Sequence, residues 1–215
     1  DMLAACQGSL EELGIEAFDA YGLHWPTAWT HQGPLQRLAE KPIEEQEALT
    51  FPKTADGEIE SASISLETAW RNLEAVAERG LSRTIGVSNV DLPQLRRILS
   101  IAEIPPAFVQ IERHPYRPRN DLVAFCRDRG IRVVAHSPLS APGLLEDPVL
   151  REIGEEESLS AAGVVLAWNV GQDVVPIPSS TRTDHVVSNL AASAERLTAD
   201  QRRRIEGLAD PGFER

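Results

Sequence analysis

The sequence predicts an α/β fold, specifically part of a (β/α)8 TIM barrel. Five short apolar segments of strand length each precede a segment of helix length, and one helix opens the chain. This alternation predicts parallel βα units with right-handed crossovers, and mostly apolar strands are typical of a sheet covered on both faces. No GxGxxG fingerprint follows the first strand, which disfavours a Rossmann fold. Because eight units typically take about 250 residues, we interpret the 215 residues as one domain, 1–215, that supplies about the last five units and lacks the first strands.

The first part of the chain alternates in the same way around one long polar segment. Apolar residues at helical spacing predict a helix over 2–13, and an apolar run predicts a buried strand over 17–23. Residues 27–63 are rich in Gln, Glu, Pro and Gly, and their length predicts a functional loop with some local structure. Residues 65–79 then show the amphipathic pattern of a helix, which ends before a glycine.

Four more strands follow, each apolar and each separated from its helix by polar residues, glycine or proline. The predicted strands are 84–87, 107–111, 131–135 and 174–177, and the predicted helices are 92–101, 120–129, 148–156, 161–169, 184–191 and 198–208.

Composition and charge exclude several classes of partner. The net charge of −12 argues against nucleic acid or an anionic membrane, and no run approaches the roughly 18 apolar residues of a membrane helix. Cys6 and Cys126 form neither a CxxC nor a zinc spacing, so we expect a reducing compartment, no disulfide and no metal site. With no signal segment ahead of the first helix, we expect a cytoplasmic protein, and the opening at Asp1 suggests a fragment. The oligomeric state is left open.

Polar residues follow every predicted strand. His24 ends the first strand and precedes Trp25 and Pro26, where the proline must stop the ladder. Taken singly, each polar residue is explained as a strand-end cap. Polar residues after all five strands, however, predict a polar ring on the catalytic rim of a barrel. The residues after the later strands are Ser88 and Asn89; Gln110, Glu112 and His114; His136 and Ser137; and Ser179, Ser180, Thr181 and Arg182.

This ring matches the needs of a nicotinamide dinucleotide. A primary amide offers one acceptor and two donors, which Ser88, Asn89 and Gln110 can satisfy, while the imidazole of His136 can stack on a flat ring. The last segment combines hydroxyls and backbone N–H groups at a helix start with Arg182 and His185, an arrangement suited to phosphate. A solvated helix face is the alternative for Arg182 and His185.

Several motifs in order resemble the aldo-keto reductase family over about residues 9–208. They are His24-Trp25-Pro26, Ile85-Gly86-Val87-Ser88-Asn89, Val109-Gln110-Ile111-Glu112 with His114-Pro115, Ser137-Pro138-Leu139, and Ile177-Pro178-Ser179-Ser180 through to Asn189. The resemblance implies a (β/α)8 barrel that binds NADPH and reduces aldehydes or ketones, with a small-molecule carbonyl substrate as the partner.

The resemblance also implies roles for single residues. His24 matches the active-site histidine that hydrogen-bonds the substrate carbonyl, and Trp25 matches a residue of the substrate pocket. His136 stands where the family usually has a larger aromatic ring against the nicotinamide. The implied cofactor-binding set is Ser88, Asn89, Gln110, His136, Ser137, Leu139, Ile177, Ser179, Ser180, Thr181, Arg182, His185 and Asn189.

The phosphate segment departs from the family pattern. Ser179 stands where many members have a lysine, and His185 where many have an arginine that grips the 2′-phosphate. We therefore expect a relaxed preference, with NADP still favoured through Arg182 and NAD possible.

The family's proton-donating tyrosine, with its lysine and aspartate, has no match in this chain. Tyr21 lies inside a strand and Tyr116 beyond the third motif. We therefore expect little carbonyl reductase activity from these residues alone, and two unpaired sheet edges prone to association. The alternative is a non-catalytic nucleotide-binding or interaction module derived from the same barrel.

Overall fold

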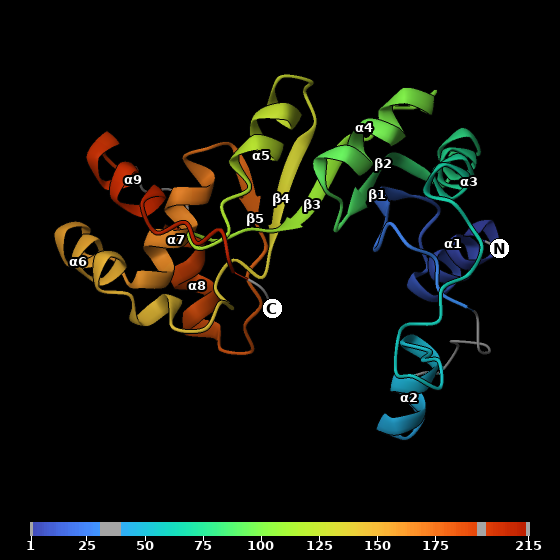
Figure 1. The fold of residues 1–215 in the computed structure, drawn as a ribbon, viewed down its shortest axis with the longest axis horizontal. Helices are drawn as coiled ribbons and strands as arrows, with labels where there is room; N and C mark the ends of the chain where they lie inside the picture. Colours follow the sequence, from blue (N-terminus) through green and yellow to red (C-terminus); the bar gives the residue numbers. More distant parts are fainter. Residues whose placement is uncertain (1, 31–39, 193–196, 214–215) are drawn as a thin grey trace. The chain divides into compact units, whose positions relative to one another are not determined.

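The computed structural model describes residues 2–30, 40–192 and 197–213 and contains one five-stranded sheet (Figure 1). Its strands follow one another in sequence order: β1 (Phe18–Leu23), β2 (Ser82–Ser88), β3 (Phe108–Glu112), β4 (Arg132–His136) and β5 (Val174–Pro176). The pairings from β2 to β5 are parallel. The α/β alternation predicted from the sequence is confirmed.

Helices separate the strands along the chain. They are α1 (Met2–Leu13), α2 (Ile43–Thr50), α3 (Leu66–Glu78), α4 (Leu92–Ile101), α5 (Asn120–Arg127), α6 (Pro148–Glu157), α7 (Ala161–Val170), α8 (Thr183–Ala192) and α9 (Ala199–Glu206), with a 3-10 turn, η2 (Leu144–Glu146), before α6. In the part of the chain that the structure describes, none of these helices has the length and hydrophobicity to cross a membrane.

The chain divides into two compact units. The first unit comprises Asp1–Ile85 and Pro93–Pro105, and the second comprises Gly86–Leu92 and Pro106–Arg215. The interpretation as one barrel domain stays a prediction.

In the first unit, α1 and α3 pack around a small core. Cys6, Leu10 and Val76 are buried there, and Phe18 and Tyr21 of β1 pack against them. None of the six residues of β1 is fully buried, so the prediction of a buried strand was wrong for β1. Because alternate side chains of a strand point to opposite faces, a single helix-covered face leaves part of the strand exposed.

The long polar segment 27–63 contains one helix that periodicity did not predict. Helix α2 is amphipathic to only a slight degree, and none of its residues is buried, so it lacks the apolar stripe by which helices are recognised. Two isolated antiparallel bridges, Trp29 with Ser61 and Lys53 with Ile59, order the rest of the described segment. Residues 31–39 of the predicted loop lie outside the described residues.

In the second unit, strand register is set in part by a glycine. Gly86 pairs with Phe108 across β2 and β3. A Cβ at position 86 would lie 2.5 Å from the Phe108 ring, so any larger residue would force the two strands or the ring apart. The same register continues to the ends of the two strands.

Helix α7 is the central helix of the second unit and contacts α6, α8 and β5 (Figure 1). Seven of its ten residues are buried, which explains its almost uniformly apolar sequence. Ser160 caps its start by accepting a hydrogen bond from the Gly163 N–H at 3.1 Å. Trp168 lies fully buried in the surrounding core.

Candidate functional site

The ends of β2 and β3 bring two of the predicted amide-binding residues together. Ser88 and Gln110 are direct neighbours in the ladder, and paired residues of a sheet present their side chains on the same face. The Asn89 N–H donates to the Gln110 carbonyl at 2.9 Å. Ser88, Asn89 and Gln110 are thus held at one sheet edge by backbone pairing.

His136 joins this group from the end of β4. Its Nε2 lies 2.9 Å from the Asn89 Oδ1, and its Nδ1 lies 3.1 Å from the Ser137 hydroxyl. Because an amide oxygen only accepts, Nε2 carries the proton, and in the neutral ring Nδ1 accepts from Ser137. Both bonds act on the ring edge and fix its orientation, so a planar ligand would meet the face of the ring.

The two residues bonded to His136 have the same unusual backbone. Asn89 has φ 59° and Ser137 has φ 50°, both in the left-handed region. Asparagine enters this region at little cost because its side chain bonds locally, whereas serine does so less readily. Such conformations concentrate at ligand sites, and here they turn the chain sharply at the ends of β2 and β4.

A cavity of about 610 Å³ opens between α7, α8 and the loops before them. Five predicted cofactor residues line it: Leu139, Ser179, Ser180, His185 and Asn189. Residues separated by up to fifty positions in the chain therefore line one cavity.

Sequence reasoning missed the opposite wall of this cavity. That wall comes from the end of α6 and the start of α7. Ser158 and Ser160, which precede the start of α7, are the sequence signal that could have indicated it. The additional lining residues are Leu145, Ser158, Leu159, Ser160, Ala161, Ala162, Gly163, Ser188, Ala191 and Ala192. Among the described residues, none that lines the cavity is Asp, Glu, Lys or Arg.

The charged groups of the phosphate segment pair with each other at the start of α8. Arg182 donates from Nε to Asp184 Oδ1 at 3.2 Å and from Nη2 to Asp184 Oδ2 at 2.6 Å. These bonds raise the pKa of Arg182 and lower the pKa of Asp184. The Ser180 hydroxyl accepts from the Arg182 N–H at 3.1 Å and so shapes the turn. Ile177 and Thr181 are exposed and do not line the cavity.

His24 and Trp25 lie in the first unit, apart in the chain from the cofactor residues of the second. Both side chains are exposed after β1. Their rings begin an aromatic row: His24 to Trp25 at 5.9 Å between centroids, Trp25 to Trp29 at 6.1 Å, and Trp29 to Phe51 at 5.3 Å. The polar segment thus adds two aromatic residues to the substrate residue predicted at position 25.

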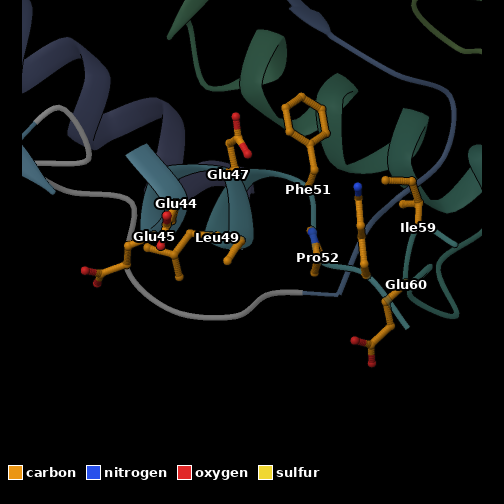
Figure 2. A pocket seen from close by; sticks show the side chains of 10 residues that line it. Glu44, Glu45, Glu47, Leu49, Phe51, Pro52, Ile59 and Glu60 are labelled. Atoms are coloured by element: carbon orange, nitrogen blue, oxygen red, sulfur yellow. The ribbon is translucent and has the colours of Figure 1, made fainter. Parts of the chain in front are cut away.

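Phe51 also lines an open groove of about 1030 Å³ in the first unit. Figure 2 shows Glu44, Glu45, Glu47 and Leu49 projecting from α2 along one part of it. Pro52, Ile59 and Glu60 come from the segment that follows, so the groove combines apolar and acidic surface (Figure 2).

Two residues expected on the polar rim are buried instead. His114 is fully buried and packs edge-on against Phe213 at 4.8 Å, and Glu112 is 9% exposed. Glu112 accepts from Arg117 at 3.0 Å. The chain reverses at His114 and Arg117, which bond to each other through their backbones, and the His114 ring packs against Phe213 of the C-terminal segment.

Neither tyrosine has the environment of a proton donor with a lowered pKa. The Tyr116 hydroxyl donates to Asp147 Oδ2 at 2.9 Å, and burial together with that bond raises the pKa of Tyr116 to about 12. Burial also raises the pKa of Tyr21, which packs against Phe18 with 5.1 Å between ring centroids.

Sequence comparison relates this chain to known proteins. A model of the Aldo/keto reductase family matches residues 1–210. Aldo-keto reductase family 1 member A1 of Sus scrofa is 32% identical over 218 residues, a match that covers 97% of this chain and 62% of the pig protein. Aldo/keto reductase slr0942 of Synechocystis sp. is 34% identical over 216 residues, covering 95% and 61%. The chain spans about three-fifths of the length of these curated relatives.

Comparison of folds agrees with the sequence matches. The aldose reductase of Schistosoma japonicum superposes with a TM-score of 0.84 at 26% identity, over 98% of this chain and 65% of that structure. The aldose reductase of Giardia lamblia gives a TM-score of 0.83 at 29% identity, over 98% and 68%.

Proposed function

This chain belongs to the aldo/keto reductase family, and on that basis we propose that it binds a nicotinamide dinucleotide for the reduction of an aldehyde or ketone to an alcohol. The observation that carries the proposal is the cavity at α8, which gathers five separately predicted cofactor residues. A serine-rich cavity whose described lining holds no Asp, Glu, Lys or Arg, next to two helix starts, suits the adenosine half of such a cofactor.

The nicotinamide half would lie at the strand ends. Ser88, Asn89 and Gln110 offer the donors and acceptors that a carboxamide requires, and backbone pairing already holds them together. His136 would lie against the nicotinamide ring, since its edge is occupied by Asn89 and Ser137. When bound, the cofactor supplies the hydride.

The resemblance to the family assigns carbonyl binding to residues of the first unit. His24 can donate a hydrogen bond to the carbonyl oxygen, where negative charge develops during reduction. Trp25 and Trp29 supply a flat apolar surface beside it, which favours an aldehyde or ketone with an apolar or aromatic body.

A proton must also reach the carbonyl oxygen. In the described residues neither tyrosine is arranged to give it, since burial keeps the pKa of each phenol raised. We therefore expect the 215 residues to bind cofactor more effectively than they turn it over.

This shortage of an acid also favours the second candidate function, a non-catalytic nucleotide-binding module. The two candidates differ in one measurement. Dinucleotide binding with NADPH-dependent carbonyl reduction supports the reductase, and binding without turnover supports the module.

The test of the proposed function is dinucleotide binding to the 215-residue chain by isothermal titration calorimetry. Asn89→Gly removes the side chain that bonds His136 and keeps the left-handed backbone accessible. We expect it to weaken binding roughly tenfold, the loss of one or two well-formed polar contacts. Asn120→Ala, at an exposed asparagine of α5 in the same unit, should leave affinity unchanged. A wild-type chain that binds neither NADPH nor NADH contradicts the proposal.

A further inference from the structure

We propose that Asp184 is a specificity-determining residue, which occupies the cation needed by a 2′-phosphate and so lets the chain accept NADH about as well as NADPH. The inference rests on the proposed function of the α8 cavity. It adds a residue that cofactor recognition by Ser179, Ser180 and His185 does not include.

A 2′-phosphate needs positive charge in the segment that binds it. A phosphate monoester carries about −1.5 to −2 charges at pH 7 and is bound best by fixed cations. From Ile177 to Asn189, Arg182 is the one arginine or lysine. Both lysines of the chain, Lys41 and Lys53, belong to the first unit. Recognition of the phosphate by this segment therefore depends on Arg182.

Arg182 is already paired with a carboxylate. Two of its nitrogens, Nε and Nη2, donate to the two carboxylate oxygens of Asp184 at 3.2 and 2.6 Å. This is the two-pronged geometry by which arginine also binds phosphate. A phosphate bound at this Nε–Nη2 edge would have to displace the carboxylate, and a phosphate bound at the Nη1 side would meet a guanidinium whose charge Asp184 already balances. Arg182 and Asp184 together contribute no net charge.

Asp184 lies in the first turn of α8. Backbone N–H groups at a helix start attract anions. A fixed carboxylate there stabilises the helix and repels a second anion. A phosphate that captured Arg182 would therefore remain next to an unpaired carboxylate.

The cavity is suited to the alternative ligand. Its polar lining consists of serine hydroxyls, the amide of Asn189 and the imidazole of His185. These groups bond neutral ribose hydroxyls without a charged partner. NADH has a hydroxyl at its 2′-position, so the absence of a fixed cation in the described lining does not lower its affinity.

The size of the effect is bounded by the exposure of the pair. The side chains of Arg182 and Asp184 are 65% and 64% exposed, and such surface pairs are individually weak. NADPH can therefore still bind. Removing the carboxylate should improve NADPH affinity on the order of tenfold, through the freed arginine and the lost repulsion together.

The test compares dissociation constants of NADPH and NADH for the wild-type chain and for Asp184→Asn at low ionic strength. We expect constants within about tenfold of each other for the wild type. Asp184→Asn should tighten NADPH alone. Adding Arg182→Ala to Asp184→Asn should remove the part of that gain that comes from the freed arginine. Asp173→Asn removes one negative charge from another arginine–aspartate pair, Arg132 with Asp173, and should change neither constant.

Three results overturn the inference while leaving dinucleotide binding intact. They are a wild type that prefers NADPH by a hundredfold or more, an Asp184→Asn variant that tightens NADH as much as NADPH, and a gain in NADPH affinity that is undiminished without Arg182. Failure of the wild type and every variant to bind either dinucleotide overturns the proposed function itself.

Discussion

At the scale of single residues, the environment of a side chain decides its chemistry. Tyr116 and Arg113 show this in opposite directions. Burial raises the pKa of the Tyr116 phenol to about 12 and lowers the pKa of the fully buried Arg113 guanidinium to about 9, since in each case the charged form is disfavoured. Arg113 remains in place through bonds to Asn169 at 2.5 Å and Pro118 at 2.8 Å.

The raised pKa of Tyr116 predicts a loss of stability in alkali. An unfolded phenol ionises near pH 10, and the folded one at about 12, so between these values the native state holds more protons than the unfolded state. The stabilisation is therefore fully present below about pH 10 and is lost as pH rises toward about 12.

Urea unfolding across this range measures the effect, with Tyr116→Phe as the matched variant. The wild-type midpoint should fall more steeply with pH than the midpoint of Tyr116→Phe, which keeps the ring and lacks the ionising hydroxyl. Parallel pH profiles for the two proteins would contradict the prediction.

At the scale of elements, the close contact between β2 and β3 is sensitive to sequence. A methyl group at position 86 would meet the Phe108 ring at 2.5 Å. We expect Gly86→Ala to lower the free energy of unfolding by about 1–3 kcal/mol, the usual cost of overpacking.

Gly8→Ala is the control. Gly8 lies in α1, and an added Cβ there meets nothing within 4 Å. Alanine should stabilise that helix by roughly 0.5–1 kcal/mol. Urea denaturation of both variants tests the pair, and two shifts of the same sign would refute the steric explanation.

At the scale of the whole molecule, the last strand and α8 both carry exposed apolar residues. β5 ends the strand order, and its Val175 is 45% exposed. Val186 and Val187 of α8 are 53% and 63% exposed. Because open sheet edges and clustered apolar side chains favour association, we expect the 215-residue chain to self-associate.

Sedimentation velocity over a range of concentrations measures this association. Val186→Ser with Val187→Ser should shift the chain toward monomer. Leu13→Ser with Ile43→Ser, at residues 63% and 73% exposed in the first unit, should have little effect. A wild-type chain that stays monomeric at all concentrations would contradict the expectation.

Much of the fold was predictable because secondary structure follows local patterns. The predicted helices over 2–13 and 92–101 coincide with α1 and α4, where apolar residues repeat at helical spacing. β1 was misjudged and α2 missed, since the burial of a strand and the stability of a weakly amphipathic helix depend on neighbours.

The sequence by itself determined the order of the strands and helices, and which polar residues end each strand. Tertiary structure alone decided which of those residues meet. His136 bonds Asn89 from 47 positions away because strand register brings β2 and β4 to one edge. The wall of the α8 cavity from Ser158 to Gly163, and the burial of His114, likewise arise from packing between segments distant in the chain. Such contacts depend on non-local geometry, which no local pattern of residue types specifies.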